Sequence, residues 1–342
     1  MPVSLRVVLD EAESSLYADL PRAALALCRL ALQNYPRCLR AYTVMAASLW
    51  AVGDPGDAVR TLRSVLVADP EDVTARYLLA LALEDTDLTG AITEMETAFA
   101  RAPWDPDIRQ ALGRLYLVRD RVPRPVETRR DALARVYARG GLWDRVLAEA
   151  ADLLVSQPNR LDLQMLLLEA EWRTGHHDEA AALCQGILLD NPLCLKANLI
   201  LSHIWQAAGK SEAGQAFFER AEEMDPEHRM ARQLFGSAGA SMPYPARKAM
   251  VELEAPAEEE GLGEGEFELP SDLQPPLPMA DVDGQDAGAA DGSVEAAAAS
   301  TLPVEPGAEP AAPAAEEPET SATASPPTPD GIVPGEPVPA SI

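Results

Sequence analysis

Four cysteines are the residues of this chain with the clearest capacity for chemistry, because thiolates bind metals and form disulfides. Cys28 and Cys38 are ten residues apart, and so are Cys184 and Cys194. Two disulfides or a four-cysteine metal site would suit this spacing. The surrounding stretches, LCRLALQNYPRCLRAY and LCQGILLDNPLCLKAN, nevertheless align as equivalent positions of one repeat. We therefore predict that all four are small apolar core residues.

The histidines offer no recognisable catalytic or metal-binding pattern. No cysteine lies at metal-ligand spacing beside His176 and His177, which are expected in a turn between helices. The sequence also has no phosphate-binding glycine loop, no nucleophile elbow and no HExxH motif. We expect a protein that is not an enzyme and that binds neither a metal nor a cofactor.

A dense arginine cluster is the third chemical feature, since guanidinium groups bind carboxylates through paired hydrogen bonds. A solvated helix face and a site for an acidic peptide both explain it. The chain carries such a peptide itself, EGEFELPSDLQPPLP, with Phe267 and Leu269 among acids, so an intramolecular contact is one prediction. The QPPLP stretch also fits a polyproline ligand of another domain. The cluster consists of Arg119, Arg121, Arg124, Arg129, Arg130, Arg135, Arg139 and Arg145.

The charge divides the chain into two parts. Residues 251–342 contain 21 of the 55 acidic residues and no Lys or Arg, so most of the net charge of −27 belongs there. This acidity argues against binding to nucleic acid or to an anionic membrane. No signal peptide and no long apolar stretch is present, which predicts a cytoplasmic protein. Only 3 of the 28 basic residues are Lys, a composition typical of GC-rich bacterial genomes.

Six prolines mark a repeat that would position these side chains. Pro36, Pro70, Pro103, Pro158, Pro192 and Pro226 are separated by 34, 33, 55, 34 and 34 residues. A period near 34 is typical of stacked helical hairpins. Proline would end each second helix, because its nitrogen has no hydrogen to donate. Four glycines would make the turn between the two helices of a hairpin: Gly53, Gly141, Gly175 and Gly209.

The apolar residues between these markers resemble the tetratricopeptide repeat family. In the second unit, Tyr42, Met45 and Ala46 share one face of the first helix, and Leu62 and Val65 face back from the second. The last unit matches through Ser202, Trp205, Phe218 and Ala221. The resemblance implies an all-α fold, a right-handed α-solenoid of about six hairpins. We expect a final helix at Glu227–Phe235.

The 55-residue interval is irregular. Asp107–Arg119 and Val126–Arg139 both have the pattern of a first helix, and no second helix separates them. Either one helix is extra, or the alternation of first and second helices slips. We expect a joint near residues 120–125. The predicted organisation is a solenoid over residues 1–238, followed by a disordered, acidic, Pro- and Ala-rich tail over residues 239–342.

In the family that this sequence resembles, the first helices line a concave groove that binds a segment of another protein. The mixture of aromatic and basic groups there suits a peptide with apolar anchors and some carboxylates. The register places the following residues in this groove: Arg40, Trp50, Tyr77, Arg114, Arg135, Arg139, Trp172, Arg173, Lys196 and His203.

The expected function is therefore a non-catalytic protein-interaction scaffold or adaptor, with a protein or peptide partner and with its acidic tail modulating the groove. A regulatory or non-catalytic subunit of an enzyme complex is the alternative. A nucleic-acid-binding solenoid is a third reading. It is disfavoured, because the inner face lacks a repeated base-reading code.

Overall fold

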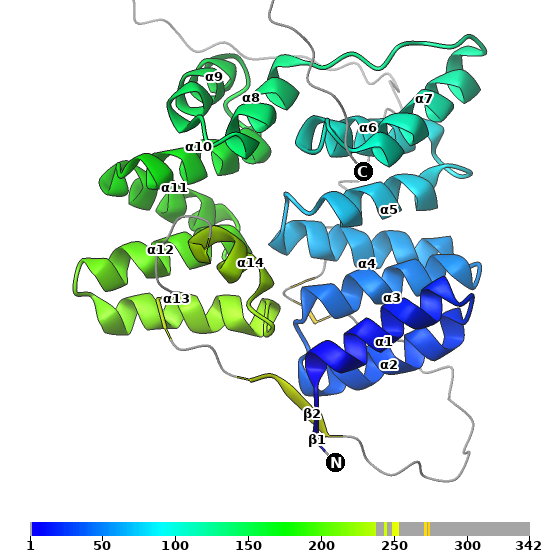
Figure 1. Ribbon diagram of the computed structural model, residues 1–342, viewed down its shortest axis with the longest axis horizontal. Helices are drawn as coiled ribbons and strands as arrows, with labels where there is room; N and C mark the ends of the chain where they lie inside the picture. Colours follow the sequence, from blue (N-terminus) through cyan, green and yellow to red (C-terminus); the bar gives the residue numbers. More distant parts are fainter. Residues whose placement is uncertain (1, 237–242, 245–247, 253–269, 272, 274–342) are drawn as a thin grey trace, which may run out of the picture. The chain divides into compact units, whose positions relative to one another are not determined.

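The structure, a computed structural model, describes residues 2–236, 243–244, 248–252, 270–271 and 273. These residues are mostly helical and form antiparallel hairpins, which confirms the predicted all-α solenoid (Figure 1). Six hairpins are present in the described part of the chain. They are α1 (Leu5–Tyr17) with α2 (Pro21–Asn34), α3 (Leu39–Ala51) with α4 (Pro55–Ala68), α5 (Val73–Leu83) with α6 (Leu88–Arg101), α8 (Arg130–Arg139) with α9 (Trp143–Ser156), α10 (Leu161–Thr174) with α11 (His177–Asp190), and α12 (Leu195–Ala207) with α13 (Ser211–Met224).

The prolines end the second helices as predicted. Each of α2, α4, α6, α9, α11 and α13 stops two residues before its proline. The intervening residue leaves the helical region, because the proline ring disfavours that conformation in the residue before it. Tyr35, before Pro36, has φ −133° and ψ 78°. The four glycine turns are also confirmed, with φ values of 70° to 90° that other residues rarely adopt.

A repeated hydrogen bond, which the sequence analysis missed, fixes the connection between successive hairpins. In five repeats, a side chain six residues after the proline donates to that proline's carbonyl oxygen. The following first helix is thereby held at a fixed angle to the preceding hairpin. The donors and distances are Tyr42 at 2.6 Å, Arg76 at 3.0 Å, Arg109 at 2.9 Å, Gln164 at 2.8 Å and Asn198 at 3.0 Å.

The irregular interval contains one helix without a hairpin partner, α7 (Pro106–Asp120). It packs on α6, as a first helix does, but residues 121–129 form no helix after it. The hairpin α8–α9 then packs against α6 as well. Thus α7 is the extra helix. The predicted helix start at Val126 is wrong by four residues, because Val126 packs against the main core from an extended segment.

The core is continuous through most of the hairpins, with one small separate cluster. The main cluster includes all four cysteines, which are free and buried, as predicted. Burial raises the pKa of the Cys28 thiol to about 12, so this thiol stays protonated and unreactive. The separate cluster lies between α8, α9 and α10 and is formed by Ala134, Val146, Ala150, Leu166 and Ala170.

The segments at the two ends of the described chain differ from expectation. Strand β1 (Pro2–Ser4) pairs antiparallel with β2 (Met250–Glu252), which lies inside the predicted disordered tail. The hydroxyl of Tyr35 bonds both the N–H and the carbonyl of Met250, at 2.7 and 3.0 Å. This β pairing escaped prediction because two three-residue strands have no sequence periodicity. Most of the other residues of the predicted tail, including Phe267 and Leu269, lie outside the described residues.

The predicted final helix is also shorter than expected. The chain forms a three-residue helix, α14 (Arg229–Ala231), which continues into a π-helical turn, η1 (Arg232–Gly236). His228, with φ 54°, precedes it in the left-handed conformation and delays its start. The residues on either side of α14 do more than cover the last hairpin, because Glu227 contacts Arg40 of α3 and Phe235 contacts Trp172 of α10.

Candidate functional site

A cavity of about 480 Å³ lies between first helices from both halves of the repeat array. Side chains of α1, α3, α5, α10 and α12 line it, together with residues of the turns before α5 and α14. Five of the six described hairpins contribute their first helix, and α8 does not line the cavity. We call these first-helix surfaces the inner face.

Carboxylates outnumber cations in this cavity. The carboxylates are Glu13, Asp69, Glu71, Asp72, Glu169, Asp225 and Glu227. The cations are Arg40, Lys196 and Arg229. Burial, with Asp72 and Glu71 close by, raises the pKa of Asp69 to about 7. The cavity therefore differs from the mixture of aromatic and basic groups predicted for the first-helix positions.

Arg40 is held by three acidic side chains from two segments. It donates to Glu13 and Asp10 of α1 at 2.9 and 2.6 Å, and to both carboxylate oxygens of Glu227 at 3.1 Å. Burial alone would lower the pKa of Arg40, but these hydrogen bonds raise it, so the guanidinium stays charged. Arg40, which the repeat register predicts to contact a partner, is therefore paired with acidic side chains of this chain.

Lys196 is the centre of a second buried network. Its ammonium group contacts Glu169 at 2.8 Å and also contacts Glu71, 125 residues earlier in the chain. Burial opposes the charge of Lys196, but the two carboxylates raise its pKa above the ordinary value. Arg135 of α8 pairs with the same Glu71 and donates to the carbonyl of Asp162 at 2.8 Å. Despite burial, Arg135 and Lys196 lower the pKa of Glu71 to about 2.

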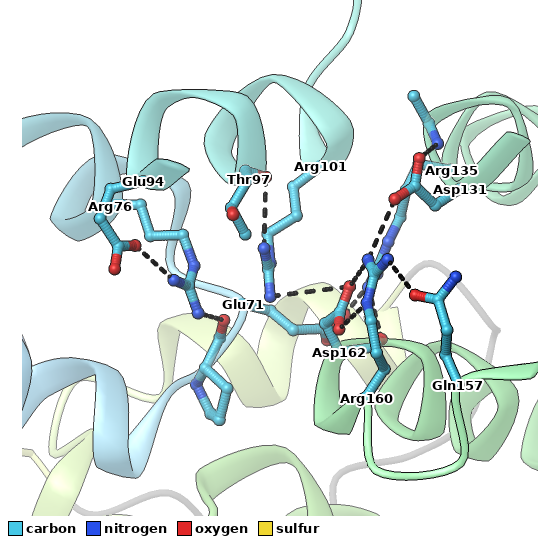
Figure 2. Close-up of polar contacts among 12 residues, drawn as sticks. Glu71, Arg76, Glu94, Thr97, Arg101, Asp131, Arg135, Gln157, Arg160 and Asp162 are labelled. Atoms are coloured by element: carbon cyan, nitrogen blue, oxygen red, sulfur yellow. Dashed lines mark hydrogen bonds and ion pairs between the residues drawn. The ribbon is translucent and has the colours of Figure 1, made fainter. Parts of the chain in front are cut away.

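Arg101, the last residue of α6, extends toward this network (Figure 2). Its side chain is only 4% exposed, and it donates to the carbonyl of Thr97 at 3.2 Å. Asp162 is 4.0 Å away and pairs more closely with Arg160, at 2.6 Å. Burial, with Arg76 and Arg135 nearby, lowers the pKa of Arg101 to about 9. Arg101, Arg135 and Arg160, which come from separate segments, therefore lie close together around the carboxylates of Glu71 and Asp162.

An aromatic cluster occupies the inner face of α10 and α12. The indole N–H of Trp172 donates to Nδ1 of His203 at 3.3 Å, and Arg173 lies over the Trp172 ring at 4.8 Å. The ring of Phe235 stacks on His203, with the centroids 5.1 Å apart, and meets Trp172 edge to face at 5.7 Å. Burial lowers the pKa of His203, and nearby His177 adds to this effect.

The remaining predicted groove residues do not join these two groups. Trp50 is exposed at the end of α3, and Tyr77 packs partly against the main core. Arg114 pairs with Glu84 at 2.8 Å. The guanidinium of Arg139 lies over the ring of Trp104, 4.4 Å from its centroid. The structure therefore brings together Arg135 with Lys196, and Trp172 with Arg173 and His203, while Arg40 lies at the other side of the cavity.

Sequence reasoning missed Glu71, Glu227 and Phe235. The repeat register considered only positions within first helices, and these three lie in turns or after the last hairpin. One signal was available, since Glu71 and Glu227 each directly follow a period-marking proline. In both cases the carboxylate turns toward a cation of the inner face.

The arginine cluster at residues 119–145 is largely engaged within the molecule. Seven of its eight members contact a carboxylate or lie over an aromatic ring. For example, Arg130 pairs with Glu149 at 2.7 Å and with Asp152 at 2.8 Å, and Arg124 lies over Tyr116. These contacts connect α8 to its neighbours.

Among the described residues, no group of three or more His, Cys, Asp or Glu side chains comes together as a metal site. None of the helices in the described ranges is both long and apolar enough to span a membrane.

A search of the curated proteins gives no match to this sequence. Among solved structures, the P58(IPK) TPR domain is 12% identical with a TM-score of 0.30, over 69% of this chain and 64% of that domain. A tetratricopeptide repeat protein from Parabacteroides merdae is 14% identical with a TM-score of 0.32, over 69% and 98% of the two chains. The TPR2AB domain of yeast Sti1, in a pHSP90 complex, is 15% identical with a TM-score of 0.31, also over 69% and 98%.

The family comparison locates the repeats in the sequence. Residues 43–89 and 132–192 match the tetratricopeptide repeat family. These segments include parts of four of the six hairpins, and similar helix–turn–helix units lie before and after them. The chain therefore contains tetratricopeptide repeats in these two segments.

Proposed function

We propose that this protein is a non-catalytic interaction scaffold that binds a segment of another protein along its inner face. The observation that carries the proposal is the cavity of about 480 Å³, to which five first helices contribute. Helical repeats that stack into a solenoid create such extended surfaces. The yeast Sti1 structure contains pHSP90, a precedent for partner binding by a protein with this repeat.

The inner face offers two kinds of contact to a partner. Near α10 and α12, Trp172, His203 and Arg173 supply aromatic and cationic surface, a combination frequent among interface hot spots. Around the cavity, Asp69 and Asp72 supply carboxylates that attract basic side chains. A segment with both apolar and charged residues fits this surface better than a uniformly acidic one.

Site-specific photo-crosslinking in the source cells tests this proposal. A photoreactive amino acid at Thr74, which is exposed and lines the cavity, should crosslink to a discrete partner. The same residue at Thr93, exposed on the second helix α6, should not. Thr74→Arg should abolish co-purification of that partner, and Thr93→Arg should leave it intact. The proposal is wrong if the partner crosslinks only from position 93, or if it still co-purifies with the Thr74→Arg variant.

The second part of the proposal concerns the acidic C-terminal segment. We infer that it competes with a partner for cationic groups, because residues 251–342 carry no basic residue. Truncation after Leu273 keeps β2 in place and should strengthen partner binding at low salt, where charge screening is weak. The same truncation should have little effect at 0.5 M salt.

A further inference from the structure

The twelve residues after the last hairpin, 225–236, lie on the inner face. They contact α3 in a distant repeat and α10 in the preceding repeat, as well as α12 of the last hairpin. Met230, Gln233 and Leu234 line the same cavity as Thr43 and Thr74. A segment that only covered the end of the solenoid would contact α12 and α13 alone. These residues, which we call the internal segment, therefore occupy the surface proposed to bind partners.

Phe235 is the apolar anchor of the internal segment. Its side chain is fully buried, between the rings of His203 and Trp172. Leu234 beside it is 2% exposed. Stacked and edge-to-face rings are favourable beyond the area that they bury. Both rings that receive Phe235 come from positions that the repeat register assigns to partner binding.

Glu227 is the charged anchor at the other end of the segment. Its carboxylate accepts two hydrogen bonds of 3.1 Å from Arg40, and its side chain is only 7% exposed. Asp225, two residues before Glu227, accepts from the backbone N–H groups of Arg229 and Met230, between the anchors, at 2.9 and 2.8 Å. The segment thus presents a carboxylate and, eight residues later, an aromatic ring.

We propose that the internal segment is an internal ligand, which a partner must displace to reach the inner face. The partner that fits is a protein segment with an acidic side chain and, eight residues later, an aromatic one. This inference rests on the proposed function. Attachment to the same chain gives the segment an effective concentration on the order of millimolar, so weak contacts suffice to keep it bound. Its regular structure is limited to α14 and η1, and Arg232 and Gln233 within it are exposed.

A peptide-binding experiment tests this directly. The probe is a fluorescein-labelled synthetic peptide of residues 224–237, and fluorescence anisotropy reports its binding to the full-length protein. Phe235→Ala and Glu227→Lys each remove one anchor of the internal segment. Both variants should bind the probe at least tenfold more tightly than the wild type. Glu219→Lys, an exposed charge change on α13, should behave like the wild type. A probe in which alanine replaces Phe235 should not bind.

The outcomes separate this inference from the proposed function. Circular dichroism establishes which variants are folded, and Glu227→Lys decides the question if Phe235→Ala unfolds. Equal binding to all proteins, or no binding to a folded anchor variant, overturns the internal ligand. The probe derives from the chain itself, so this result is independent of any partner. A partner that crosslinks equally at Thr74 with and without Glu227→Lys would refute displacement while leaving the scaffold intact.

Discussion

The hairpins α8–α9 and α12–α13 follow the same repeat but are held in place differently. Helix α12 has nine buried residues, whereas α8 has three: Asp131, Ala132 and Ala134. Ionic and cation–π contacts hold α8, including those of Arg130, Arg135 and Arg139. The difference follows from the neighbours, because α7 lacks a second helix that would cover α8 with apolar surface. The repeat defines a hairpin, and the adjoining elements decide how it is stabilised.

The sharpest test of this contrast truncates one apolar side chain in each hairpin. Ile200 of α12 is fully buried, and Val136 of α8 is 43% exposed. Ile200→Ala should lower the free energy of unfolding by about 2–5 kcal/mol through lost burial and the cavity left behind. Val136→Ala should change it by less than about 0.5 kcal/mol. Urea unfolding followed by circular dichroism measures both, and equal losses would refute the contrast.

The second test removes an ionic contact of α8. Arg135→Met leaves the buried carboxylate of Glu71 with Lys196 alone. Loss of a sole partner of a buried charge costs about 3–5 kcal/mol. We expect about 2–3 kcal/mol here, because Lys196 stays in contact. Arg145→Met, whose guanidinium lies over Tyr137 at an exposed site, is the matched control and should cost less than about 0.5 kcal/mol. Similar losses in the two variants would show that α8 does not depend on its buried ion pair.

The third test concerns the turn before α5. Glu71 in this turn contacts Arg135 of α8 and Lys196 of α12, so it joins both hairpins. Asp69 in this turn has a pKa of about 7, raised by burial and by Asp72 and Glu71, although Lys196 opposes the rise. The unfolded carboxyl has a pKa of about 3.9. Between about pH 4 and pH 7 the Asp69 carboxyl is therefore protonated in the folded chain but charged in the unfolded chain. Above pH 7 it is charged in both states, and its buried charge lowers the stability of the folded chain.

Asp69→Asn removes this charge and keeps an oxygen for the backbone N–H of Glu71. The variant should be more stable than the wild type by about 1 kcal/mol or more at pH 8. The gain should disappear near pH 4. Thermal unfolding at the two pH values measures it, with Asp85→Asn, at an exposed position, as the control. A pH-independent effect of Asp69→Asn would exclude the raised pKa.

Local signals predicted the elements of the fold well. The prolines and glycines fix helix ends through backbone constraints that act within a few residues, so Pro70 and Gly53 could be interpreted without a structure. The site was less predictable. Glu71 meets Lys196 across 125 residues, and Arg40 meets Glu227 across 187. A repeat register describes contacts between neighbouring units only, so it contains no information about these pairs. It also placed Trp172 and His203 on one helix face, where the two side chains are in contact, without revealing that Phe235 covers them.

The contacts between distant repeats change how this solenoid should unfold. A stack of repeats usually frays from its ends, because each terminal unit is held by one neighbour only. Here the first strand is paired with β2, Arg37 pairs with Glu223, and the side chain of Asn191 bonds the carbonyl of Val67 at 2.5 Å. The terminal hairpins therefore gain a second set of neighbours. Opening of the first hairpin is thermodynamically coupled to opening of the last, and amide hydrogen exchange should be slow at both ends instead of fastest there.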